Sequence, residues 1–179
     1  MRFDENGWAE GIVKPLAPGE AWSLLAPEAS PRVEAERWAH QAETFFRTKV
    51  AVVQAKRYPS GALPMTDALS VDVSRKGDQQ ATRVLVITVP IDRAPDVRER
   101  AALGVQAIGG AGFDALTAKA KRVWQVEAKP GDGGDPRASL ALAAVLALVL
   151  LAPVVPPEEV SIFGVKGARQ RLEALGWKT

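Results

Sequence analysis

Residues 138–157 read ASLALAAVLALVLLAPVVPP, and no charged side chain interrupts them. A helix on the surface of a domain carries apolar residues on one face, whereas a helix over this stretch is apolar all round. Leu142 and Val149 fall on one face of it, and Leu140 and Ala147 fall on the opposite face. The stretch therefore needs cover on every side, from the core of its own domain, from a neighbouring subunit or from lipid.

The prolines that follow favour cover by the chain's own core. Pro153, Pro156 and Pro157 end the helix after roughly fifteen residues, which is short of the about 20 that cross a bilayer. Asp135-Pro136 predicts the start, with the carboxylate as N-cap and a proline in the first turn. We predict a buried core helix and no membrane span, with a subunit contact as the alternative.

Hydrophobic periodicity predicts the other elements. Helical spacing indicates helices over residues 30–46, 92–108 and 165–175. Runs of β-branched residues indicate strands over residues 50–56, 68–74, 83–91, 122–129 and 160–163. Residues 113–121 fit a short helix and a strand equally well. This order predicts an α+β domain, or a three-layer α/β one, with a mixed sheet of about five strands covered by four helices.

The first residues predict an extended N-terminal arm. Residues 1–29 contain three prolines, and Trp8, Trp22, Leu24 and Leu25 lie between or before them. Apolar residues spaced by prolines are typical of a segment laid over a surface, either the chain's own or a partner's. We therefore predict an arm over residues 1–29, a single domain over residues 30–179, and those four apolar residues as candidate partner-binding residues.

The composition excludes several kinds of site. The chain has 179 residues, 47% of them hydrophobic, which is enough for a sizeable core. It has no cysteine, which excludes disulfides, thiolate catalysis and cysteine zinc sites. Its one histidine, His40, falls on the polar side of the first predicted helix, so we expect a solvated residue there and no histidine metal cluster. The polar opening MRFDENGWAEG lacks the apolar part of a signal peptide. These features predict a cytoplasmic protein, or part of a particle assembled in the cytoplasm.

The evidence for a nucleic-acid partner is weak. The formal net charge is only +2, although the pI near 9.0 keeps such a partner open. Lys119, Lys121 and Arg122 are candidates to contact a phosphate backbone, and Trp124 is a candidate to stack on a base.

One pattern carries a chemical hypothesis. Gly112-Phe113-Asp114 is followed, after twelve residues, by Glu127-Ala128-Lys129 at the end of an apolar strand. This pattern resembles the D…ExK core of the PD-(D/E)xK nuclease superfamily. The resemblance covers residues 112–129 and implies that Asp114 and Glu127 hold Mg²⁺ or Mn²⁺ from adjacent strands, with Lys129 as the catalytic lysine. It also implies that Glu99 supplies the further acid found in some members. A helix over residues 113–121 would take Asp114 off a strand.

Two hypotheses about function follow. The first is a non-catalytic interaction or assembly protein, a structural component of a larger complex such as a phage-like or appendage particle. It needs no cofactor, and its partners are other protein chains in a homo- or hetero-oligomer. The alternative is the metal-dependent nuclease. The nuclease requires the carboxylates of Asp114 and Glu127 to lie within roughly 4–5 Å of each other in an open cleft.

Overall fold

One antiparallel sheet organises the molecule. The computed structural model describes residues 13–53, 67–131 and 133–179. In these residues a sheet of six strands is accompanied by five α-helices, which confirms the α+β class. Every neighbouring pair of strands is antiparallel. The prediction of a mixed sheet is therefore wrong.

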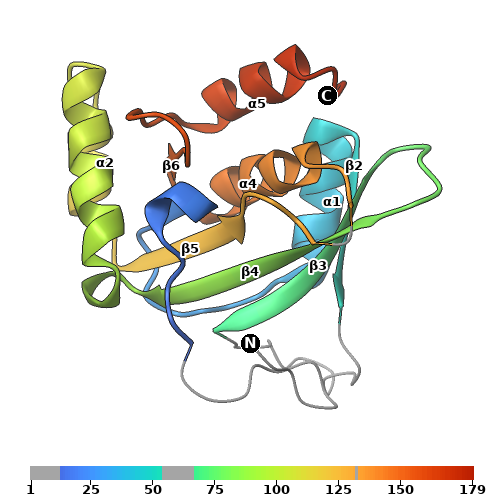
Figure 1. Ribbon diagram of the computed structural model, residues 1–179, viewed down its shortest axis with the longest axis horizontal. Helices are drawn as coiled ribbons and strands as arrows, with labels where there is room; N and C mark the ends of the chain where they lie inside the picture. The colour runs from blue at the N-terminus through green and yellow to red at the C-terminus, as the bar shows by residue number, and fades with distance from the viewer. Residues whose placement is uncertain (1–12, 54–66, 132) are drawn as a thin grey trace.

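The strands lie in the order β2-β3-β4-β5-β1-β6 (Figure 1). Their bounds are β1 (Ala21–Ala26), β2 (Thr48–Val53), β3 (Ala68–Arg75), β4 (Thr82–Pro90), β5 (Arg122–Glu127) and β6 (Val154–Val155). The helices are α1 (Ala35–Phe46), α2 (Pro95–Ala107), α3 (Phe113–Ala118), α4 (Arg137–Leu150) and α5 (Val165–Ala174). Two short 3₁₀ helices, η1 (Pro18–Glu20) and η2 (Ile91–Arg93), precede β1 and α2.

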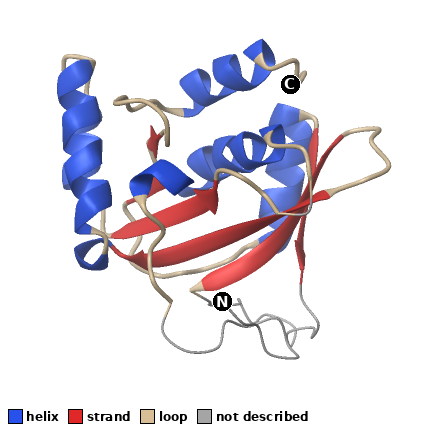
Figure 2. Cartoon of the chain, viewed as in Figure 1, coloured by secondary structure: helices blue, strands red, loops and turns tan. Residues whose placement is uncertain are grey.

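The apolar stretch forms α4, and its cover comes from the chain itself. Almost every side chain of α4 from Ala138 to Val149 is buried. The helix lies between the sheet and α5 and also packs against α1 (Figure 2). The backbone N–H of Arg137 donates to Asp135 Oδ1 at 3.0 Å, so the predicted carboxylate does cap the first turn. Leu151 ends the helix in the left-handed conformation and is 72% exposed. None of the described helices combines the length and the apolar character needed to cross a membrane.

Side chains alternate between the two faces of the sheet and build two cores. On β4, Val84 and Val86 face the core that contains α1, α4 and α5. Ile87 and Val89 belong to the second core, together with Val97 of α2. Helices therefore contribute to the cores on both faces, and the central strands are buried on both sides.

The arm prediction is wrong for residues 21–26, because they form β1 in the interior of the sheet. This strand pairs with β5, from Ala21 opposite Glu127 to Ala26 opposite Arg122, and with β6 on its other side. Leu24 and Leu25 are 0% and 1% exposed, one in each core, so neither is free to bind a partner. A strand buried on both faces lacks the polar alternation by which strands are recognised. Trp8 lies outside the described residues.

The strand predicted over residues 160–163 is also wrong. Only Phe163 takes part in the sheet, through an isolated bridge to Val154. The edge strand is β6, and Pro153 and Pro156 restrict it to two residues because proline has no N–H to donate. The ambiguous residues 113–118 are the helix α3.

Candidate functional site

A groove of about 990 Å³ opens where β1 begins and β5 ends. Its lining comes from segments far apart in the sequence: the approach to β1, the residues after β5, the first turn of α4, the loop after β6, and the residue after α5. The apolar lining residues include Leu16, Trp22, Leu140, Pro156, Pro157 and Leu175. Leu140 and the two prolines are buried, whereas Leu16 and Trp22 are half-buried and Leu175 is 52% exposed. The groove thus has a rigid apolar floor and accessible apolar side chains above it.

Of the predicted partner-binding residues that the structure describes, Trp22 lines this groove. It lies on the face of β1 that carries Leu24, but nearer the end of the strand. Its ring makes an edge-to-face contact with Phe163, with 6.4 Å between the centroids. This contact holds one part of the indole while another part stays accessible.

The loop that follows β6 is held from two sides. Arg100 of α2 donates from Nη2 to the carbonyl oxygens of Pro157 and Glu159, at 2.9 and 3.2 Å. Arg171 of α5 donates from Nη2 to Glu159 Oε1 at 2.7 Å. With Pro156 beside Pro157, few backbone conformations remain open to this wall of the groove.

The approach to β1 is held by a side chain that acts like a neighbouring strand. Gln125, fully buried on β5, accepts the N–H of Leu16 through Oε1 at 2.7 Å. Its Nε2 donates back to the carbonyl oxygen of Leu16 at 2.9 Å. Sequence reasoning missed this role, although a glutamine inside the apolar run Val123 to Val126 was the available signal.

Glu127 has a structural partner at the point where β5 leaves β4. The ladder between these strands ends at the pair Val86 and Val126, and the next N–H on β4, that of Leu85, donates to Glu127 Oε1 at 2.8 Å. Burial raises the pKa of Glu127, and the Leu85 hydrogen bond opposes that shift. The carboxylate therefore replaces a missing backbone acceptor at the end of the sheet.

The nuclease resemblance requires a strand at Asp114, and the structure has a helix there. Asp114 is exposed on α3, which packs against α2, whereas Glu127 and the exposed Lys129 line the groove. Glu99 is exposed on α2. Within the described ranges no group of three or more histidine, cysteine, aspartate or glutamate residues is placed to hold a metal ion. Binding of Mg²⁺ or Mn²⁺ by Asp114 and Glu127 stays a prediction.

Two residues considered for nucleic-acid contact belong to the core instead. Trp124 is 1% exposed and packs edge-to-face on Trp38 at 5.9 Å. Arg122 is buried, donates from Nε to the carbonyl oxygen of Ala29 at 2.7 Å, and its burial lowers its pKa. Both lie on β5, which is covered by β4 and β1 on its two sides. His40 is exposed on α1, as expected.

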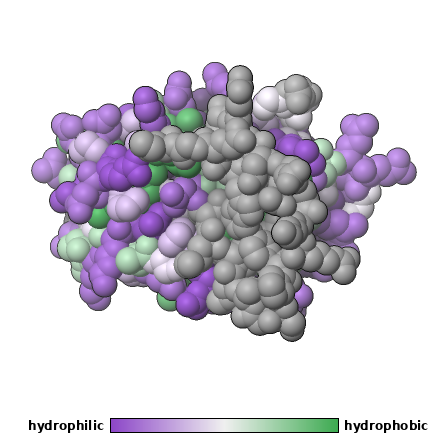
Figure 3. Space-filling view, turned by 90° about the horizontal axis from the view of Figure 1, so that it is seen from below, coloured by the Kyte–Doolittle hydropathy of each residue, from purple (hydrophilic) through white to green (hydrophobic). Residues whose placement is uncertain are grey.

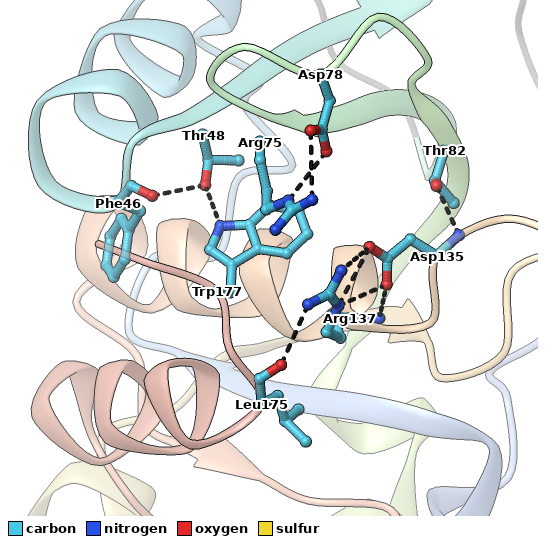
Figure 4. Close-up of polar contacts among 9 residues, drawn as sticks. All are labelled: Phe46, Thr48, Arg75, Asp78, Thr82, Asp135, Arg137, Leu175 and Trp177. Atoms are coloured by element: carbon cyan, nitrogen blue, oxygen red, sulfur yellow. Dashed lines mark hydrogen bonds and ion pairs between the residues drawn. The ribbon is translucent and has the colours of Figure 1, made fainter.

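A second polar cluster surrounds Trp177 (Figure 4). The indole Nε1 donates to Thr48 Oγ1 at 3.0 Å, and the guanidinium groups of Arg75 and Arg137 lie 5.9 and 5.7 Å from the ring centroid. Arg75 is paired with Asp78, and Arg137 with Asp135, whose pKa is lowered by its hydrogen bonds to Arg137. Both arginines beside the ring are paired with aspartates. The cluster therefore holds the side chain of Trp177 in place.

Comparison of the chain with protein-family models, with curated proteins and with solved structures found no match. Its function is therefore argued from the groove and its surroundings.

Proposed function

We propose that the chain is a non-catalytic interaction protein that binds a segment of another protein chain in the groove, as a structural component of a larger assembly. The observation that carries the proposal is the groove itself, in which Leu16, Trp22 and Leu175 present accessible apolar surface over a buried floor. Tryptophan is one of the residues that most often supply a large share of the binding free energy at protein interfaces, and burial of a leucine side chain adds an apolar contribution.

The construction of the groove also favours binding. Its walls are ordered before any partner arrives, because Arg100 and Arg171 hold the loop after β6 and Gln125 holds Leu16. A surface that is already ordered loses less conformational entropy on binding than a flexible one. An extended segment bound there would bury its apolar side chains against residues that do not have to move.

Many hydrophobic side chains of the described residues are buried in the two cores, and exposed ones such as Leu103, Leu116 and Leu151 lie outside the groove. Figure 3 shows mainly hydrophilic residues over the described part of one face, with hydrophobic ones in small patches. Scattered apolar residues of this kind are normal on a protein surface. The groove differs because its apolar residues converge on one concave site.

A selection from a random 12-residue peptide display library tests the proposal. We expect selected peptides to bind about tenfold more weakly to the Leu175→Ser variant, since an apolar contact at the groove is lost. The matched control is Leu116→Ser on α3, which changes a leucine that is 43% exposed and outside the groove. Peptides that bind both variants as well as the unchanged protein would overturn the proposal.

Light scattering of the full chain decides whether the partner is another copy of it. A stable oligomer that becomes a monomer in Leu175→Ser and persists in Leu116→Ser would identify self-assembly through the groove. A monomer at all concentrations assigns the groove to a different protein chain.

A further inference from the structure

More of the charged residues that line the groove are acidic than basic. The acidic ones are Glu20, Glu127, Glu158 and Glu159, and the basic ones are Lys129 and Arg137. Arg137 is already engaged, because it binds Asp135 and the carbonyl oxygen of Leu175. Glu159 is likewise engaged by Arg171. The charges left to meet a ligand are therefore mostly negative.

Two of the glutamates are exposed and have no partner. In the part of the chain that the structure describes, the side chains of Glu20 and Glu158 make no hydrogen bond or ion pair. Among the described residues, the side chain of Lys129 likewise makes no hydrogen bond or ion pair. An unpaired carboxylate at the rim of an apolar groove can pair with a cation without first giving up another interaction.

The backbones that carry these two glutamates are held in place. The carbonyl oxygen of Glu20 accepts the N–H of Ala128 at 2.9 Å, which extends the pairing of β1 with β5 by one residue. Glu158 lies between Pro157 and Glu159, whose carbonyl oxygens both bind Arg100. The two segments run close to each other, because a Cβ added at Gly19 would lie 3.9 Å from the carbonyl oxygen of Pro157. Glu20 and Glu158 each follow one of these two neighbouring residues, and both line the groove.

Building on the proposed function, we infer that the segment bound in the groove carries an apolar side chain next to a lysine or arginine. The apolar side chain packs against Trp22 and Leu175, and the cationic group pairs with Glu20 and Glu158. Acidic segments are disfavoured, since they would bring like charges to the same rim.

The size of the effect follows from where the charges lie. Ion pairs between exposed groups are weak and are screened by salt, so the two glutamates select the partner more than they hold it. The apolar contacts supply most of the affinity, and the charge decides which apolar segment is accepted.

The peptides selected against the unchanged protein test this inference. Among those whose binding depends on Leu175, we expect lysine and arginine to be enriched over aspartate and glutamate relative to the starting library. The double variant Glu20→Gln/Glu158→Gln should bind them more weakly by about two- to fivefold for each carboxylate removed. Raising the salt concentration should reduce the difference. The matched control is Glu99→Gln on α2, outside the groove, which should bind them like the unchanged protein.

The outcomes separate the two proposals. Peptides that need Leu175 but are not enriched in basic residues, or that bind the double variant unchanged, overturn the charge inference and leave the groove as a binding site. The absence of any peptide that depends on Leu175 overturns the proposed function and the charge inference together.

Discussion

At the scale of single residues, polar side chains of β5 form hydrogen bonds with backbone groups that have no backbone partner in the sheet. Glu127 accepts the N–H of Leu85 where β5 separates from β4, and Gln125 pairs with both backbone groups of Leu16. A buried N–H without an acceptor costs about 1–3 kcal/mol, so each of these hydrogen bonds is a structural reason for its residue type. The glutamate that the nuclease resemblance places at a metal has this role in the folded chain.

The pKa of Glu127 leads to a prediction about pH. Burial raises that pKa in the folded state, so between the unfolded and folded pKa values the folded chain binds more protons, and stability falls as the pH rises through this window. Glu127→Gln keeps an oxygen for the Leu85 N–H and removes the ionisation. We expect the stability of the variant relative to the unchanged protein to increase as the pH rises above the usual pKa of a glutamate carboxyl group.

Urea unfolding at several pH values measures this difference. Glu99→Gln removes an exposed carboxylate on α2 and serves as the control. A gain for Glu127→Gln that does not grow with pH, or that the control matches, would show that burial of this carboxylate does not disfavour its charge.

At the scale of elements, close packing of α2 sets the position of one groove wall. Gly104 of α2 lies against the backbone of Ser161, in the same loop that carries Glu158 and Glu159. Arg100, one turn earlier, binds two carbonyl oxygens of that loop. The glycine allows the helix backbone and the loop backbone to touch, and the arginine then reaches its acceptors.

Replacing Gly104 by alanine should lower the free energy of unfolding, whereas a glycine-to-alanine change in a helix usually raises it. In an exposed helix this change stabilises by up to about 1 kcal/mol. Here the new Cβ would overlap the carbonyl group of Ser161, so the helix or the loop must shift. We expect a loss of about 1–3 kcal/mol in the free energy of unfolding, measured by urea titration.

Weaker binding of the selected peptides is a second expected result for Gly104→Ala, because the groove wall moves with the loop. Gln106→Ala, at an exposed position of the same helix, should change stability by less than about 0.5 kcal/mol. A Gly104→Ala protein that is more stable than the unchanged one would mean that the contact relaxes freely.

At the scale of the whole molecule, Trp177 joins the end of the chain to segments distant in sequence. Its indole is 1% exposed, and its Nε1 donates to Thr48, at the start of β2. Arg75 comes from the end of β3 and Arg137 from the start of α4, so residues around the ring derive from three further elements. Burial of this ring keeps α5 and the residues after it on the core.

Trp177→Ala should lower the free energy of unfolding by about 3–5 kcal/mol, since a large buried side chain leaves a cavity. Trp177→Phe keeps an aromatic ring and loses the hydrogen bond to Thr48, so its cost should be nearer 1 kcal/mol. Thermal or urea unfolding of both variants measures the difference. Equal and small losses would show that the end of the chain contributes little to the fold.

Local patterns predicted much of the fold but little of the groove. Trp22 was singled out as a partner-binding residue, and Glu127 and Lys129 for a different chemistry, and these three do line the groove. Leu175 and the loop after β6 were not singled out, because nothing in their own sequences indicates a site. They become neighbours of Trp22 only through the pairing of β1 with β6 and the packing of α5 on α4.

Hydrophobic periodicity alone predicted the buried helix α4, the strands β2 to β5 and the helices α1, α2 and α5, because it reflects which side of an element is buried. Tertiary structure decided the placement of β1 between β5 and β6, the short β6 in place of a strand over residues 160–163, and the groove at their ends. Strand order depends on pairs such as Ala21 with Glu127, which are far apart in the chain. Such pairs form only when the whole core assembles, so no local pattern contains them.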